Sequence, residues 1–243
     1  MKGACKNIAR LLHDVVALIY PPQCHLCFGV EVSEHCRFIC EPCWQRITNE
    51  TLPRLRESSR VLPLETPIVN CDFDLAAWHY RGTMAMLIPQ MKYHNAHPSF
   101  AKIFGALAAQ RMAPVLEKWL SPQTLLLPVP LHSVRQRERG FNQSELIARA
   151  FAEAWQLELS PHALVRIRYT KQQARFVEHE DRRRNVQEAF AVRRKVPLEG
   201  SEVVLVDDVI TSGATMSACA QVLRAAGAKR VGAVALARGG GVL

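Results

Sequence analysis

Short apolar runs alternate with longer stretches of helical spacing along residues 73–243. The runs have lengths typical of buried strands: LAAWHY, TLLLPVPL, EVVLVDD and RVGAVALAR, with a shorter one near ALVRIR. The stretches between them predict helices: TMAMLIPQMKY, FAKIFGALAAQRMAPVLEKWL, NQSELIARAFAEAWQL and TMSACAQVLRAAG. This alternation predicts an α/β domain with a parallel sheet and helices on both faces. Ligands of such sheets bind beyond the carboxyl ends of the strands.

The first 72 residues follow a different pattern. Residues 1–20 carry apolar positions on one helical face and predict an amphipathic helix that ends before Pro21. His13 and Asp14 interrupt its apolar run, and no stretch of the chain reaches the roughly 18 apolar residues of a membrane span. We therefore expect neither a signal peptide nor a span, and a cytoplasmic location. Residues 48–72 mix both charges with prolines and predict a connector.

Four of the eight cysteines form two pairs, CHLC at 24–27 and CEPC at 40–43, with twelve residues between the pairs. A two-residue gap lets both sulfurs of a pair point at one ion, so four thiolates predict a closed structural zinc site in a module of residues 21–47. A disulfide framework is the alternative, and it fits poorly with the expected cytoplasmic location. The predicted zinc ligands are Cys24, Cys27, Cys40 and Cys43, with His25, His35 and Cys36 as possible substitutes, whereas Cys5, Cys71 and Cys219 are expected to be small buried residues.

The charge balance favours an anionic partner. The chain has 31 basic and 22 acidic residues and a net charge of +9. Nucleic acid, a phosphorylated substrate and an anionic surface all fit such an excess, and so does a basic protein without an anionic partner.

The segment VVLVDDVITSGAT, residues 203–215, indicates which of these anionic partners the chain binds. Backbone N–H groups of residues 211–215 at a helix start form a cradle suited to a terminal phosphate. Gly213 lets the backbone approach that phosphate, and neighbouring hydroxyl groups add donors. Asp207 and Asp208 lie just before the cradle and can accept hydrogen bonds from neutral hydroxyls. The pattern predicts a site for a phosphorylated sugar, and the Walker nucleotide motif GxxxxGK[ST] is absent from the sequence.

The same thirteen residues resemble the phosphoribosyl-pyrophosphate (PRPP) signature of type I phosphoribosyltransferases. LPVPLHSVRQRERGFNQSELIA at 127–148 resembles a block of the ComF/GntX family, whose members are associated with competence and DNA utilisation. The double CxxC, the Lys92–Tyr93 element and DRRRNVQEAF at 181–190 also belong to that family's pattern. The resemblance implies a type I phosphoribosyltransferase-like sheet preceded by a small zinc-ribbon-like module.

The resemblance also implies roles for individual residues. Asp207 and Asp208 would hold the ribose hydroxyls, and in a transferase they would steady a cationic sugar. The loop after the strand at 124–131 would bind pyrophosphate together with the arginines that follow. Mg²⁺ would be coordinated mainly by PRPP oxygens. The implied phosphate-binding residues are Lys92, Val129, Pro130, Arg135, Arg139, Thr211, Ser212, Gly213, Ala214 and Thr215. No segment clearly forms the hood with which base-salvage members of the fold recognise a nucleobase.

Two functions remain open at this point. The first is a DNA-uptake or DNA-utilisation protein that binds PRPP and single-stranded DNA, with DNA-processing proteins as partners; its stacking candidates are Phe38, Trp44, Tyr93 and Phe141. The second is an active PRPP-dependent transferase that acts on a nucleobase or a nucleic-acid-derived acceptor. A zinc scaffold for protein partners is a third reading.

Overall fold

The structure is a computed structural model that describes residues 23–29, 38–50, 56–57, 68–92, 98–168, 189–193 and 196–239. The chain divides into two compact units, residues 1–50 and 51–243, and each is described by itself. The helix predicted over residues 1–20 lies outside the described residues, as do His35, Cys36, Tyr93 and most of the predicted connector.

The first unit contains helix α2, Glu41–Thr48. Cys40 is its N-cap and Pro42 stands in its first turn, where a missing N–H costs no helical hydrogen bond. The apolar side chains of Ile39 and Ile47 are fully buried, together with the sulfur of Cys24. The segments that carry the two CxxC pairs are joined by a hydrogen bond from the N–H of His25 to Phe38 O at 2.9 Å.

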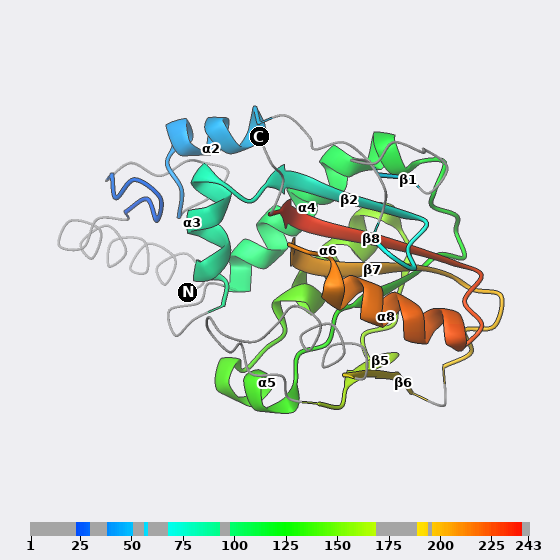
Figure 1. The fold of residues 1–243 in the computed structure, drawn as a ribbon. Helices are drawn as coiled ribbons and strands as arrows, with labels where there is room; N and C mark the ends of the chain where they lie inside the picture. Colours follow the sequence, from blue (N-terminus) through cyan, green and yellow to red (C-terminus); the bar gives the residue numbers. More distant parts are fainter. Residues whose placement is uncertain are drawn as a thin grey trace, which may run out of the picture. The chain divides into compact units, whose positions relative to one another are not determined.

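The second unit is built on a six-stranded sheet with the order β1-β2-β8-β7-β3-β4 (Figure 1). Neighbouring strands run parallel except at β1, which is antiparallel to β2. The strands span Arg56–Glu57, Phe73–His79, Leu125–Pro128, Glu158–Leu159, Glu202–Ile210 and Arg230–Arg238 for β1, β2, β3, β4, β7 and β8. The parallel sheet predicted from the alternation is confirmed, and β1 places part of the expected connector at the sheet edge.

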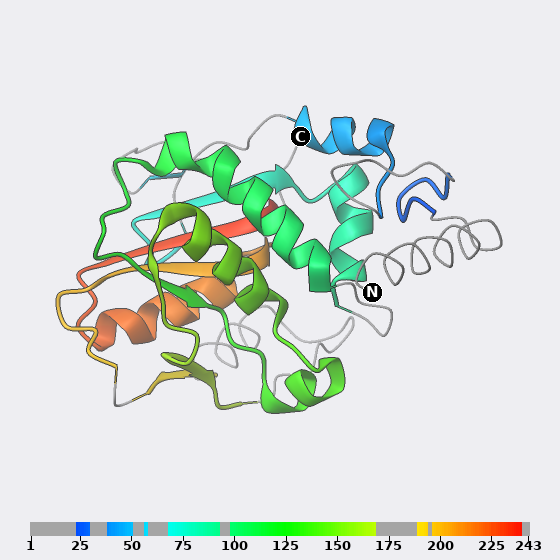
Figure 2. The same cartoon turned by 180° about the vertical axis from the view of Figure 1, so that it is seen from behind.

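Helices cover both faces of this sheet, as predicted. Helices α4, Pro98–Leu116, and α6, Gln143–Trp155, pack on one face, and α8, Ala214–Ala225, packs on the other (Figures 1 and 2). Gly105 makes the α4–α6 approach possible, since a Cβ there would lie 2.8 Å from the Cβ of Ala150. Two shorter helices complete the unit: α3, Gly82–Gln90, and α5, Ser133–Arg139. No helix among the described residues is long and apolar enough to cross a membrane.

The core under α8 consists of side chains from the central strands and the inner face of the helix. Leu205 on β7 and Leu223 on α8 have no solvent exposure. Each contributes about 2 kcal/mol through burial. Cys71 and Cys219 lie in the same core, which confirms that they are small buried residues.

Two details of the strands differ from the sequence prediction. The run EVVLVDD predicts a strand that ends at the acids, but β7 continues to Ile210, because Val209 and Ile210 pair with the end of β8. The strand predicted near ALVRIR exists as β5, Leu164–Arg166, yet it pairs antiparallel with β6, Phe190–Val192, in a separate two-stranded sheet. Strand partners depend on tertiary contacts that a run of apolar residues does not specify.

Candidate functional site

The two acids lie at the carboxyl edge of the sheet, where β7 extends past its neighbour. Strand β3 ends at Pro128, which pairs with Val206. The next residues of β7, Asp207 and Asp208, therefore lie beyond the end of β3 and keep only β8 as a strand neighbour. This is the part of a parallel sheet where a ligand can reach strand residues.

Each carboxylate of this diacid, Asp207 and Asp208, has protein partners. The Ser144 hydroxyl donates to Asp207 Oδ1 at 2.7 Å, and the backbone N–H of Asp208 donates to the same oxygen at 2.8 Å. Asp208 Oδ2 lies 2.6 Å from Lys92 Nζ and accepts from Gln143 Nε2 at 3.3 Å. Two adjacent carboxyl groups are thus held by one ammonium group and three neutral donors.

The environment makes Asp207 hard to ionise. Burial raises the pKa of Asp207 to about 7, and the adjacent carboxylate of Asp208 adds to the rise. The Ser144 hydroxyl, the Lys92 ammonium group and the Asp208 backbone N–H lower the pKa, but they do not offset burial. A carboxyl group with a pKa near neutrality is a common feature of functional sites.

The predicted phosphate cradle follows directly on β7. Gly213 has a φ of +78° and is the N-cap of α8, but it supplies no side-chain cap. The N–H of Ala214, the first residue of α8, donates to Ser212 Oγ at 3.4 Å. The N–H groups that follow receive no acceptor from the N-cap residue, which suits them to an anion. Thr211 and Ser212 are exposed, and Ala214 and Thr215 are half-buried. The acids and the cradle are thus neighbours along one strand–turn–helix segment, as the sequence predicts.

The predicted pyrophosphate loop is anchored to the same edge. The N–H of Val129 donates to Val206 O at 2.9 Å, and Val129 O accepts from Asn142 Nδ2 at 3.0 Å. Both backbone polar groups of Val129 thus have protein partners, whereas Pro130 is half-buried at the start of the loop. The pyrophosphate role of these two residues stays a prediction.

The arginines after this loop lie on helix α5, with His132 as its N-cap. Arg137 is exposed, and Arg135 and Arg139 are half-buried. Arg139 Nη1 donates to Gln143 Oε1 at 3.2 Å, so it lies close to the residue that contacts Asp208. The helix thus presents a guanidinium group close to the residue that contacts Asp208, and its role in binding phosphate stays a prediction.

The structure places Lys92 and the first residues of α6 in contact with the diacid, which the sequence did not predict. The sequence places Lys92 among the phosphate-binding residues, and in the structure its ammonium group contacts Asp208. Gln143 and Ser144 were not predicted as site residues, although both contact the diacid. Their only sequence signal is a polar run after Asn142, which also predicts a helix cap. The sequence offers Asn142 or Ser144 as this cap, and in the structure Asn142 is the N-cap, because its Oδ1 accepts from the N–H of Ser144 at 3.1 Å.

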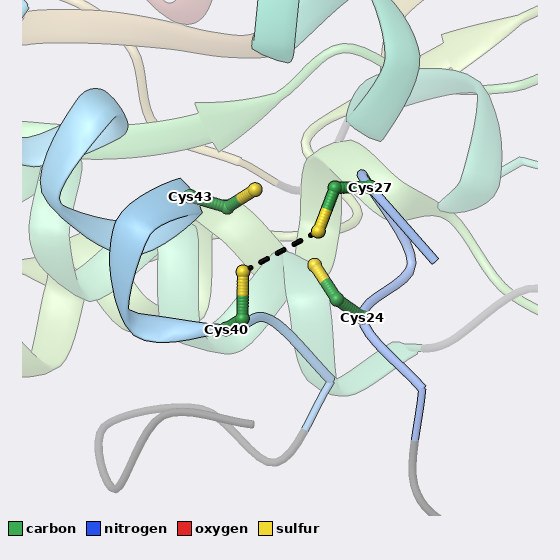
Figure 3. Close-up of side chains that lie close together, drawn as sticks. All are labelled: Cys24, Cys27, Cys40 and Cys43. Carbon is green, nitrogen blue, oxygen red and sulfur yellow. Dashed lines mark hydrogen bonds between the residues drawn. The ribbon is translucent and has the colours of Figure 1, made fainter. Parts of the chain in front are cut away.

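The four predicted zinc ligands lie together in the first unit. Their sulfur atoms are all within 4.8 Å of one another (Figure 3), and those of Cys27 and Cys40 are 3.5 Å apart. Zn–S bonds of about 2.3 Å in a tetrahedron place sulfurs about 3.8 Å apart, so the cluster is of the right size. Arg46 Nη2 donates to Cys43 Sγ at 3.0 Å, and Leu26 N donates to Cys24 Sγ at 3.4 Å, which favours thiolates.

The thiols of this cluster differ in acidity. Burial raises the pKa of Cys43 to about 12, and the neighbouring cysteines add to the rise. Burial also opposes ionisation of Cys24, but backbone hydrogen bonds lower its pKa to about 6. A metal ion that binds here must displace the protons of the less acidic thiols, which makes metal uptake pH-dependent.

Comparison with known proteins gives relatives over most of the chain. The DNA utilization protein YhgH of Salmonella typhimurium is 30% identical over 235 residues, which cover 94% of this chain and 87% of that protein. Competence protein F of Haemophilus influenzae is 30% identical over 66% of this chain and 70% of its own length. Residues 105–241, more than half of the chain, match the family of the phosphoribosyl transferase domain. The chain belongs to the ComF family.

Another relative of this ComF-family chain is competence protein ComFC of Bacillus subtilis, which is 29% identical over 61% of this chain and 56% of that protein. Among solved structures, a glutamine phosphoribosylpyrophosphate amidotransferase from B. subtilis shares 21% identity over 60% of this chain and 30% of its own, with a TM-score of 0.35. A similarity that low supports no conclusion about function. The phosphoribosyltransferase-like fold predicted from the sequence is confirmed by the family match.

Proposed function

We propose that this ComF-family protein binds PRPP with Mg²⁺ at the carboxyl edge of its sheet and serves DNA utilisation. The observation that carries the proposal is the diacid on β7, directly followed by the start of α8, whose N-cap Gly213 has no side chain to occupy the helix N–H groups. PRPP has a 5-phosphate at one end and vicinal hydroxyls a few ångströms away. The cradle suits the phosphate, and the carboxylates suit the hydroxyls.

The charges around the diacid fit a neutral sugar better than a free cation. Lys92 already balances Asp208, and Asp207 has a raised pKa, so the pair carries less net charge than two free carboxylates. Vicinal hydroxyls donate to such acceptors without bringing charge. Mg²⁺ would be coordinated by PRPP oxygens and would neutralise the pyrophosphate together with Arg135 and Arg139.

Titration calorimetry with PRPP and Mg²⁺ tests this proposal. Asp208→Asn should weaken PRPP binding at least tenfold, because an uncharged amide is a weaker acceptor for the hydroxyls. Glu153→Gln is the matched control, since Glu153 is exposed on α6 and should leave binding unchanged. Ribose 5-phosphate should bind more weakly than PRPP. Absence of binding to the native protein at millimolar PRPP would refute the proposal.

Single-stranded DNA is the second proposed ligand, and the arginines of α5 favour it. Arg137 is exposed and Arg135 half-buried on one short helix of a chain with a net charge of +9. Three of the stacking candidates are half-buried, namely Phe38, Trp44 and Phe141, and Tyr93 lies outside the described residues. DNA-processing proteins stay proposed partners, since the relatives are competence and DNA utilization proteins.

Oligonucleotide binding that weakens steeply with salt would support the DNA proposal. The double variant Arg135→Gln/Arg137→Gln should reduce both the affinity and the salt slope. Lys102→Gln removes an exposed positive charge on α4 and is the control for net charge. Binding that does not change with salt, or equal losses in both variants, would count against a site on α5.

Transferase activity is the alternative use of the same site. The C1–O bond of PRPP would break with its electron pair leaving on pyrophosphate. C1 would form a bond to a nucleobase nitrogen, and the proton of that nitrogen would pass to water. The diacid would steady the cationic sugar between the two events. Pyrophosphate release that requires an acceptor base or oligonucleotide, and that is lost in Asp208→Asn, would establish this activity. If no pyrophosphate is released with any acceptor, ligand binding without turnover would be the function of the site.

We further propose that the four-cysteine cluster holds a structural zinc ion. Four thiolate ligands leave no open coordination position, so the ion would stabilise the fold of the first unit and would not activate water. The fit rests on the sulfur separations within 4.8 Å.

A further inference from the structure

Three consecutive polar side chains at the start of α6 are buried, although a helix packed on a sheet usually buries apolar residues there. Asn142, Gln143 and Ser144 are 8%, 3% and 1% exposed. Burying polar side chains costs free energy unless they form hydrogen bonds. Their partners therefore indicate what these residues do.

Gln143 uses both ends of its amide at the site. Its Nε2 donates to Asp208 Oδ2 at 3.3 Å, and its Oε1 accepts from Arg139 Nη1 at 3.2 Å. Only this orientation of the amide satisfies a carboxylate on one side and a guanidinium group on the other. The amide therefore links the diacid on β7 to the arginine on α5.

Ser144 and Asn142 complete the arrangement. The Ser144 hydroxyl donates to Asp207 Oδ1 at 2.7 Å. Asn142 caps α6 through its oxygen and donates through Nδ2 to Val129 O at 3.0 Å. An aspartate could form the cap but has no donor for the carbonyl. The start of α6 is thus tied to the end of β3 and to both carboxylates on β7.

We propose that Gln143 and Ser144 are positioning residues that fix the carboxylates of Asp208 and Asp207, and that Gln143 couples the diacid to Arg139. This inference rests on the proposed PRPP site. The ribose-binding acids and the cationic helix α5 are then held as one unit. A ligand with hydroxyls at one end and pyrophosphate at the other meets both at a fixed spacing, which lowers the cost of ordering the site.

Calorimetry on three serine variants tests the role of Ser144. Ser144→Ala should weaken PRPP/Mg²⁺ binding about tenfold, and Ser144→Thr, which keeps the hydroxyl, should restore it to within about threefold. Ser201→Ala is the matched control, because Ser201 also loses a 2.7 Å hydrogen bond, to Leu198 O, at the opposite end of β7. Native affinity in Ser144→Ala, or equal losses in the alanine and threonine variants, would overturn the proposal.

A second readout does not require PRPP. The carboxyl of Asp207 accepts from Ser144 on α6 and interacts electrostatically with Asp208 on the same strand, Lys92 after α3 and Cys219 on α8. Carbon-13 NMR of that carboxyl should show a higher pKa in Ser144→Ala and a native-like pKa in Ser144→Thr, because the hydroxyl favours the charged form. An unchanged titration in Ser144→Ala would overturn the positioning role. If the native protein binds no PRPP, the proposed function fails, and this titration still decides the role of Ser144.

A double-mutant cycle tests the coupling through Gln143. Gln143→Leu and Arg139→Leu should each weaken PRPP binding, and the double variant should lose less than the product of the two losses, because both remove the same link. Independent losses that multiply would overturn the coupling.

Discussion

The ionised carboxylate of Asp207 lowers the stability of the folded protein, because its environment favours the protonated form. Its pKa of about 7 lies above the ordinary value of 3.8, so between these pH values the native state holds a proton that the unfolded chain has released. The free energy of unfolding should therefore fall as pH rises from about 4 to about 7, by on the order of 4 kcal/mol at most. The contribution is fully present below pH 4 and lost above pH 7.

We predict that Asp207→Asn flattens this dependence, because the amide cannot ionise and still accepts the hydrogen bond from Ser144. Urea unfolding at a series of pH values measures the effect, and the variant should be more stable than the native protein at pH 8. Glu153→Gln, which removes an exposed carboxylate, is the control. Parallel pH profiles for Asp207→Asn and the native protein would contradict the prediction.

Single residues also show how far the sequence leads at the site. The motif at 203–215 predicts the acids and the cradle, because an uninterrupted segment holds both. Gln143 and Ser144 lie more than sixty positions before the acids that they contact, and a polar residue at a helix start serves equally as a cap. Sequence spacing contains no information on such long-range pairs.

At the scale of elements, the turn from β7 to α8 is constrained twice at Gly213. Its φ is +78°, and a Cβ there would lie 2.8 Å from Ile68 Cγ1. Gly140 has the same φ of +78° at the end of α5, but nothing lies within 4 Å of its would-be Cβ. The two glycines thus share the backbone conformation and differ in the space around it.

We predict that Gly140→Ala destabilises the protein by about 1 kcal/mol through backbone strain alone, and Gly213→Ala by about 2–3 kcal/mol. Combining Gly213→Ala with Ile68→Ala should recover part of the extra cost, measured as the coupling in a double-mutant cycle of unfolding free energies. Equal costs at the two glycines would show that Ile68 yields freely.

Elements were predictable where a local pattern determines them. The apolar period places β2, β7, β8 and the long helices α4, α6 and α8. The pairing of β5 with β6, the edge strand β1 and the extension of β7 to Ile210 were missed, because each depends on a partner distant in sequence.

At the scale of the whole molecule, the two compact units draw stability from different sources. The unit of residues 51–243 has an extensive apolar core on both faces of a sheet, whereas the described part of residues 1–50 buries few large apolar side chains, chiefly Ile39 and Ile47. A unit of that size normally needs a metal or disulfides to stay folded. Its four clustered cysteines are the residues that could hold such a metal.

We therefore predict two separable transitions, each controlled by its own ligand. A chelator should remove one equivalent of zinc and unfold the unit that contains α2. Hydrogen exchange measures this: the amides of α2 should lose their protection, while the amides of β7 and β8 keep theirs. Cys43→Ser should have the same effect without chelator, and Cys219→Ser, outside the cluster, should retain zinc. PRPP with Mg²⁺ should raise the free energy of unfolding of the unit of residues 51–243 only, by RT ln(1 + [L]/Kd). Loss of β7 and β8 protection on chelation would show instead that the two units fold as one, because removal of an ion from one unit cannot otherwise destabilise strands of the other.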